Sequence, residues 1–194
     1  MSTLELKELS HPAGQVIKIA AGKTLDLKTQ GSVTMPTGSV LQVVSSTKTD
    51  TFSVTGTTFT DVPDLSVTIT PTSTSSKILV SVDIHLDSSI RYAAAKLYRG
   101  STIIALGDTD NSRARIFIAA QRNQEAPNDE YVLHNQSGSY LDSPATASAV
   151  TYKIQVGNTY DVNGVTYVNR PSNNDNYSYI PRGISTITLM EIQG

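Results

Sequence analysis

One segment of the chain carries an apolar residue at every second position, and this constrains the fold more than any other feature. In "KILVSVDIHLD" the apolar side chains at positions 78, 80, 82, 84 and 86 fall on one side of an extended strand. A period of two residues is typical of a strand with one face in a core, because successive side chains point to opposite faces. The same alternation recurs at 65–69 and 150–156. The sequence therefore predicts an all-β protein.

The composition supports this prediction. Ser and Thr number 23 and 24 among 194 residues, whereas charged residues make up only 16%. Strands tolerate Thr well, while helices favour Glu, Lys, Ala and Leu. From residue 39 onward we expect a series of strands with short turns between them, including a hairpin that turns at Arg99 and Gly100. A β-sandwich or jelly roll over 39–194 is the expected architecture.

The chain closes on the apolar, strand-prone segment "GISTITLMEIQ". Chain ends are more often polar and poorly ordered, so a strand of this kind must be covered by something. Only 38% of the residues are hydrophobic, and a lean core is often supplemented by oligomerisation. We therefore expect further copies of the chain to help cover this strand, with Ile187, Leu189 and Ile192 as candidate contacts between copies.

Residues 1–38 have a different pattern. Ile17, Leu25 and Val33 follow one another at intervals of eight, with glycines between them. The short strands that this spacing indicates cannot bury their apolar edges alone, so they need neighbouring strands from the same chain or from partner chains. We expect a short β shaft that is intertwined with two further copies around these three residues. A loosely ordered N-terminal arm is the alternative.

Charge and cysteine content exclude several classes of protein. The chain carries 15 Lys and Arg against 17 Asp and Glu, so it has no basic field for nucleic acid. It has no cysteine, which excludes disulfides and zinc–thiolate sites. No apolar run approaches the roughly 20 residues that a membrane helix needs, and the first residues lack the pattern of a signal peptide. We expect no nucleic acid, no membrane insertion and no cofactor.

Metal sites and catalytic groups are weakly indicated. Asp83 and His85 share one strand face with Asp87, and Asp108 and Asp110 lie together in "GDTDNS". Carboxylates and imidazole can bind divalent metals, but a polar outer strand face and a solvated turn explain the two patterns better. No nucleophile motif is present, and nothing marks a pair of catalytic carboxylates. We expect no enzymatic activity; a carbohydrate enzyme with a carboxylate pair is the remaining alternative.

The strongest functional pattern is the segment 157–182, which is rich in tyrosine and asparagine. Tyr offers a large contact area at a low entropy cost, and Asn supplies adaptable hydrogen bonds. An ordinary polar loop with rings over the core edge is the alternative. The candidate receptor-binding residues are Tyr160, Tyr167, Asn169, Arg170, Asn173, Asn174, Asp175, Tyr177 and Tyr179.

An ordered series of segments resembles the fibre proteins of bacteriophages, particularly tail-fibre-like proteins of marine phages that infect cyanobacteria. The opening "MSTLELKEL" is similar to the N-terminal segment of such fibres, and "GSVLQVV" resembles the start of their globular head. The successive blocks of the head resemble "KILVSVDIHL", "AAAKLYRGSTIIALGD", "LDSP", "VTYKIQV" and "STITLMEI". Together these blocks cover most of 39–194.

The resemblance implies a homotrimer with a jelly-roll head similar to the C1q/TNF fold, in which the C-terminal strand lies near the threefold axis. It implies a virion protein, on the tail or the capsid surface. Its N-terminal arm would dock to other virion proteins, and its head loops would bind a host surface glycan or protein. A trimeric decoration protein of the capsid is the alternative function. Many tail fibres are far longer than this chain, which leaves the position on the virion open.

Overall fold

The structure is a computed structural model that describes residues 21–22, 35–126 and 128–194. Contacts divide the chain into the units Met1–Thr34 and Met35–Gly194, and the description below concerns the second. The predicted shaft residues Ile17, Leu25 and Val33 lie outside the described residues. Among the described residues, no helix is long and apolar enough to span a membrane.

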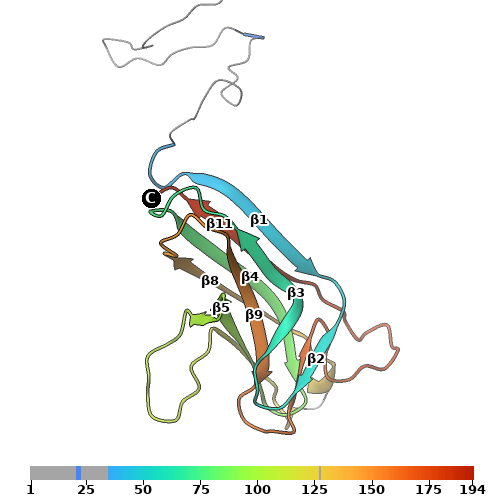
Figure 1. Cartoon of the computed structure of the whole chain (residues 1–194). Helices are drawn as coiled ribbons and strands as arrows, with labels where there is room; N and C mark the ends of the chain where they lie inside the picture. Colours follow the sequence, from blue (N-terminus) through green and yellow to red (C-terminus); the bar gives the residue numbers. More distant parts are fainter. Residues whose placement is uncertain (1–20, 23–34, 127) are drawn as a thin grey trace, which may run out of the picture. The chain divides into compact units, whose positions relative to one another are not determined.

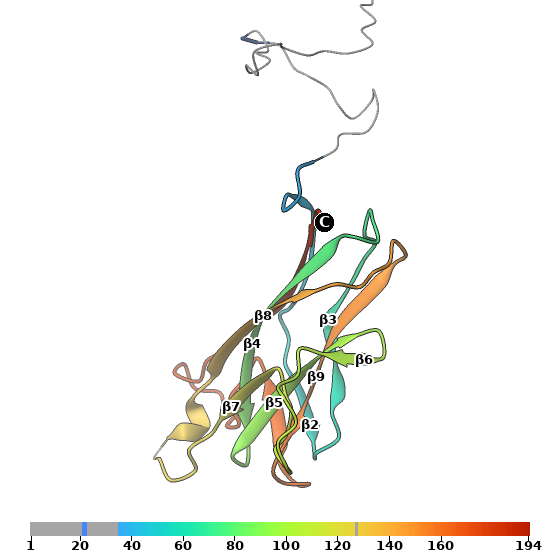
Figure 2. The ribbon, with the colours of Figure 1, turned by 90° about the vertical axis from the view of Figure 1, so that its left-hand side faces the viewer.

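The unit Met35–Gly194 is a sandwich of two antiparallel sheets, as the sequence predicts (Figure 1). Sheet A is formed by β1 (Val40–Lys48), β11 (Ser185–Ile192), β4 (Lys77–Ser88), β10 (Val165–Val168), β2 (Phe52–Thr55) and β8 (His134–Asp142). Sheet B is formed by β3 (Thr60–Ile69), β9 (Val150–Asn158), β5 (Tyr92–Arg99), β6 (Thr102–Ile104) and β7 (Ile118–Gln121). The one helical element described is the 3₁₀ turn η1 (Asp129–Tyr131). Figure 2 shows the two layers from the side.

The inward faces of both sheets form one core, and the alternation in the sequence identifies the residues that line it. All five predicted inward residues of β4 are fully buried: Ile78, Val80, Val82, Ile84 and Leu86. In β9, Tyr152, Ile154 and Val156 are also fully buried. The predicted hairpin is confirmed too, since Arg99 pairs with Thr102 and Gly100 adopts a positive φ of 58° at the turn.

The apolar C-terminal strand is covered within its own chain. β11 lies in the interior of sheet A, between β1 and β4. The side chains of Ile187 and Leu189 point toward sheet B and have no exposed surface. The prediction that these two residues contact another copy is therefore wrong, because the second sheet of the same chain already covers them. Ile192 belongs to the opposite face of the strand and is only partly buried.

A polar cluster links the two sheets at the edge of the core. Asp142, at the end of β8, accepts hydrogen bonds from the Tyr152 hydroxyl (2.6 Å) and from the Arg99 guanidinium (2.9 and 3.0 Å). Burial, followed by the hydrogen bond to Asp142, raises the pKa of Tyr152. The phenol therefore stays neutral and donates its proton to the carboxylate, and this satisfies the polar end of a ring that otherwise lies in apolar surroundings.

Asp142→Ala is expected to lower the free energy of unfolding by about 3–5 kcal/mol, because it leaves the Tyr152 hydroxyl and the Arg99 guanidinium without their shared acceptor. Urea denaturation would measure the change. Asp61→Ala is the control, since the ion pair between Asp61 and Lys153 lies near the surface and such pairs contribute about 0–1 kcal/mol. Equal losses in the two variants would contradict a stabilising role of the Asp142 cluster.

Candidate functional site

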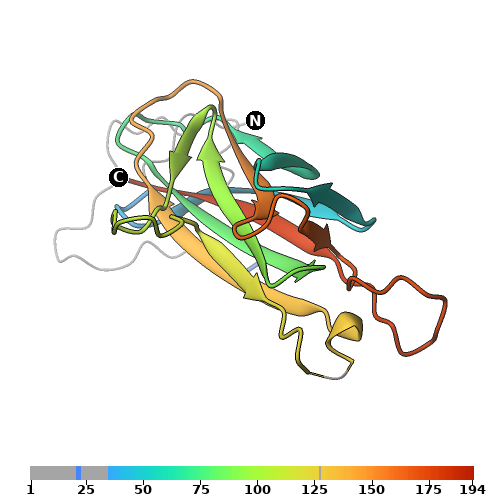
Figure 3. The same cartoon turned by 90° about the horizontal axis from the view of Figure 1, so that it is seen from below.

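The candidate site is built on a long loop that interrupts a strand. β10 and β11 both pair antiparallel with β4: Val168 faces Leu86, and Thr186 faces Asp83. β10 and β11 thus lie one after the other beside β4. Residues 169–184 form the loop that leaves the sheet after β10 and re-enters it at β11. Figure 3 shows this loop projecting from the sandwich. Both ends of the loop are therefore fixed by the sheet.

Asn169 closes the base of the loop. Its backbone is in the left-handed region (φ 62°), and its side-chain amide donates to the carbonyl oxygens of Lys48 (2.9 Å) and Asp50 (2.8 Å). Its side-chain oxygen accepts from the Ser185 hydroxyl at 2.6 Å, and its carbonyl accepts from the Gly183 amide at 3.1 Å. Asn169 has no exposed surface. Its predicted role in receptor contact is wrong, because the side chain is used to close the loop.

Glycine is required at position 183 for a steric reason. A Cβ atom there would lie 2.7 Å from the imidazole ring of His85. That ring is held in place, since its Nδ1 lies 2.7 Å from the carbonyl oxygen of Ile184. The close approach of the backbone at position 183 to β4 therefore depends on glycine having no side chain.

A second polar group fixes the first half of the loop. The Ser172 amide donates to Asp87 of β4, and the Ser172 hydroxyl accepts from the Arg122 guanidinium at 2.8 Å. The Asn173 amide donates to the carbonyl oxygen of Glu130 at 2.9 Å, which joins the loop to η1. Asp87 is therefore buried beneath the loop and does not share the exposed outer face of β4 that the sequence suggested.

Burial raises the pKa of the Asp87 carboxyl, although hydrogen bonds from Ser172 and the charge of Arg122 oppose the shift. A carboxyl with a raised pKa binds its proton more tightly in the folded state than in the unfolded state. Its contribution to stability is fully present below the unfolded pKa, near 3.8, and is lost as the pH rises through the folded pKa. Asp87 thus carries a free-energy cost of ionisation at neutral pH.

Asp87→Asn is expected to remove this pH dependence, because Asn accepts the Ser172 bond without ionising. Between pH 4 and pH 7, the free energy of unfolding should fall more for the natural protein than for the variant. The difference amounts to about 1.4 kcal/mol for each pKa unit of the shift. Urea titrations of both proteins at several pH values would measure it. A smaller fall in the free energy of unfolding for the natural protein than for the variant would mean that Arg122 favours the ionised carboxylate more than burial disfavours it.

The loop and η1 together present a group of tyrosines, which we call the tyrosine platform: Tyr177 and Tyr179 of the loop and Tyr131 of η1. The rings of Tyr177 and Tyr179 are stacked, with centroids 5.2 Å apart and planes inclined by 6°. Tyr131, in η1, packs edge-on against Tyr179 at 5.7 Å and 87°. Tyr177 is 55% exposed and Tyr179 is 62% exposed. Large aromatic surfaces left open on a well-anchored loop are typical of binding sites.

Polar groups surround the tyrosine platform. The guanidinium of Arg182 donates to the side-chain oxygen of Asn174, and the Asp175 amide donates to the side chain of Asn173 at 2.8 Å. Ile180, which follows Tyr179 in the loop, is buried. The predicted residues Asn174, Asp175, Tyr177 and Tyr179 are thus exposed together on one loop.

Two further predicted residues pair with each other at the base of the loop. Tyr167 lies within β10, opposite Asp87 and Ser53, and is partly buried. The guanidinium of Arg170 lies over its ring, 4.0 Å from the centroid. This cation–π contact covers the ring. Tyr167 and Arg170 therefore stabilise the base of the loop.

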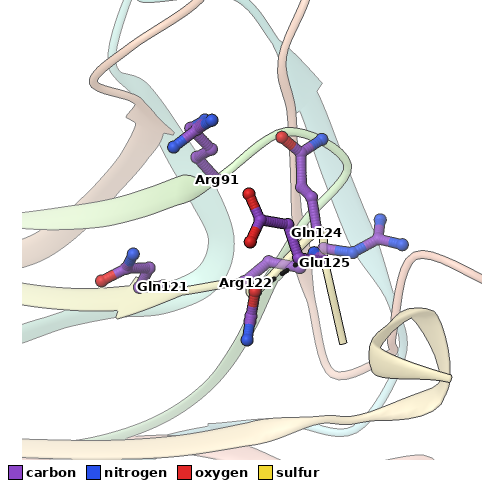
Figure 4. A pocket seen from close by; sticks show the side chains of 6 residues that line it. Arg91, Gln121, Arg122, Gln124 and Glu125 are labelled. Atoms are coloured by element: carbon purple, nitrogen blue, oxygen red, sulfur yellow. Dashed lines mark hydrogen bonds between the residues drawn. The ribbon is translucent and has the colours of Figure 1, made fainter. Parts of the chain in front are cut away.

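Tyr160 belongs to a second exposed group near the same end of the sandwich. Its ring is 59% exposed, lies 6.0 Å from the ring of Tyr92, and is covered in part by the Arg91 guanidinium at 5.5 Å. Arg91 also lines a polar pocket of about 190 Å³ (Figure 4). The pocket is lined by Arg91, Gln121, Arg122, Asn123, Gln124 and Glu125. Guanidinium and amide groups of this kind can hydrogen-bond hydroxyl or carboxylate groups.

Sequence reasoning missed the contributions of Arg91, Tyr92 and Tyr131. They lie outside the segment 157–182, and only the packing of β5 and η1 brings them beside the predicted tyrosines. No local pattern marks them, because a single Tyr or Arg at the start of a strand or in a short turn is ordinary.

The weak metal candidates do not come together. The Asp83 side chain accepts a hydrogen bond from Asn135 at 3.3 Å, and Asp110 forms an ion pair with Arg113 at 3.1 Å. Asp108 is exposed. Over residues 35–126 and 128–194, no three His, Cys, Asp or Glu side chains are grouped so that they could hold a metal ion.

No protein-family model matches the chain, and no curated protein matches it. Among solved structures, it is similar to chains of infectious bursal disease virus. For the Gx strain the identity is 12% and the TM-score 0.36, with 87% of this chain and 42% of that chain covered. For the VP2 subviral particle the values are 11%, 0.37, 88% and 42%. This chain thus spans less than half of theirs. The likeness is too distant to support a function, and the fold follows from the strand pairing itself.

Proposed function

We propose that this chain is a homotrimeric virion fibre protein that attaches a phage particle to its host cell through loops of the head. The observation that carries the proposal is the tyrosine platform, where stacked and exposed rings lie on a loop fixed at its base by Asn169. The ordered resemblance of residues 39–194 to phage fibre heads gives the biological setting.

The position of the loops supports this proposal. The segments 159–164 and 169–184 lie toward one end of the sandwich, and the start of β1 and the C-terminus lie toward the other (Figures 1 and 2). A chain whose residues 1–38 dock to other virion proteins would thus extend these loops outward. Loops on a rigid scaffold are where binding usually resides.

The chemistry of the site suits a glycan or an exposed protein loop on the host surface. Tyrosine rings offer flat apolar faces for the C–H faces of a sugar, and their hydroxyls, Asn174 and Arg182 offer hydrogen bonds. Because the rings are already stacked and the loop is already closed, little entropy is lost on binding. Three such sites in one trimer, repeated around a particle, convert weak contacts into firm and reversible attachment.

Competition for the host surface would test this function. The purified protein, added in excess to host cells, is expected to reduce the adsorption of particles that carry it, and antibody labelling should locate it at the tail or capsid surface. Labelling of the capsid without any competition would overturn the attachment function in favour of a capsid decoration protein. A protein absent from particles would overturn both functions.

A further inference from the structure

The outward faces of the two sheets differ in chemistry. On sheet B, Lys153 forms an ion pair with Asp61 at 2.7 Å, and Asp61 also accepts from Gln155 at 2.7 Å. The ammonium of Lys96 lies 3.9 Å from the centroid of the Phe59 ring. Charged groups that pair with one another in this way are typical of a face in contact with water.

Sheet A carries a row of apolar side chains across its outward face. The strand register places Val43 of β1 beside Met190 of β11, Met190 beside Leu79 of β4, and Leu79 beside Leu141 of β8. Val43 is 54% exposed and Leu141 is 49% exposed. Apolar residues scattered singly on a surface need no explanation, but a continuous row across four strands marks a contact surface.

A second pair extends this apolar row. Val40 pairs with Ile192, next to the row and on the same face of the sheet. β11 therefore has apolar side chains on both faces at its C-terminal end, with Leu189 inward and Met190 and Ile192 outward. Apolar residues on both faces are expected where a strand is covered on both sides.

The row next to the apolar row consists of small, uncharged side chains. The next row across the same four strands consists of Ser45, Thr188, Ser81 and Ser139. Neither this row nor the row from Val43 to Leu141 contains a charged side chain; the charged outward residues of β4 are Lys77, which pairs with Ile192, and Asp83, which pairs with Thr186. Short hydroxyl side chains leave a flat surface that another protein surface can approach closely without desolvating a charge.

We propose that the outward face of sheet A is the surface through which copies of this chain contact one another, with the apolar row at its centre. The inference rests on the homotrimer of the proposed function and assigns it a surface. Around a threefold axis each copy can present this face to its neighbours without repulsion, because the apolar row and the hydroxyl row carry no charge.

The course of the chain favours copies of itself over another partner. The segment that leads from Met35 into β1 is bonded to the C-terminal end of β11, through the Gly38 amide and the carbonyl oxygen of Gln193 at 2.8 Å. The 34 preceding residues therefore join the head beside the apolar row. Contacts through this face would bring these junctions together, as the repeat of Ile17, Leu25 and Val33 requires if partner chains are to complete it.

Light scattering on the full-length protein would test the surface. The natural protein is expected to have the mass of three chains at micromolar concentration, and a Val43→Lys, Leu141→Lys double variant the mass of one, with unchanged circular dichroism. Both side chains are half exposed within one chain, so the changes leave the core intact. Val162→Lys, at a loop position 69% exposed, is the matched control and should remain trimeric.

Thiol labelling gives a second measurement that does not depend on dissociation. Because the chain contains no cysteine, Val43→Cys and Val162→Cys each place a single thiol on it. In the assembled protein, maleimide should modify Cys at 43 at least about tenfold more slowly than Cys at 162, since a covered thiol is inert. Equal labelling rates at positions 43 and 162, or a double Lys variant that remains trimeric, would overturn the proposed contact surface without contradicting the attachment function. A monomeric natural protein would overturn both the surface and the trimer.

Discussion

Leu189→Asp is expected to leave no folded head. Leu189 has no exposed surface and lies in the core between β11 and sheet B. Removing a buried Leu side chain costs about 2–5 kcal/mol, and an unpaired buried charge costs several more. Together these losses approach the whole stability of an ordinary domain, about 5–15 kcal/mol. Circular dichroism and thermal denaturation of the purified variant would measure the loss.

The expected loss of folding arises in the core of a single chain and does not depend on assembly into a trimer. Val162→Asp is the control for adding a carboxylate as such, because that side chain is exposed in a loop, and it should fold and melt like the natural protein. A monomeric but well-folded Leu189→Asp variant would contradict the core position of this residue. It would instead return Leu189 to the contacts between copies that the sequence suggested.

The double change Tyr177→Ala, Tyr179→Ala is expected to reduce adsorption to host cells sharply while the melting temperature changes little. Both rings are more than half exposed, and their stack adds little to the core. Truncating an aromatic side chain that anchors a ligand typically costs about 2 kcal/mol or more at each site. In a trimer with several sites engaged, such losses multiply in the avidity of the particle. Particle adsorption and scanning calorimetry would measure the two effects.

Tyr177→Phe, Tyr179→Phe is the matched control for this experiment. It keeps the stacked rings and removes only the hydroxyls, so it separates contact with the ring faces from hydrogen bonding. A large drop in the melting temperature of the Ala variant would mean that the rings stabilise the loop. Normal adsorption with normal stability would remove the tyrosine platform from the contact surface, and would favour the decoration function or the Tyr160 group as the contact.

Features that depend on neighbouring residues could be predicted from the amino-acid sequence. The alternation of β4 and β9 predicted which side chains are buried, because a strand's two faces are defined by its own backbone. The hairpin at Gly100 was likewise predicted, since turn residues act within a few positions. The exposure of Tyr177 and Tyr179 follows from the many polar residues around them.

Features that depend on pairing between distant strands could not be predicted and became visible only in the folded chain. Nothing near Asn169 in the sequence shows that it closes a loop against Lys48 and Asp50, and nothing near Asp87 shows that Ser172 covers it. The covering of Leu189 by its own second sheet, and the apolar row from Val43 to Leu141, also arise only when β1, β11, β4 and β8 align in one register. Register is a property of strand pairs, and a single strand's pattern fixes which of its faces is apolar without fixing what that face meets.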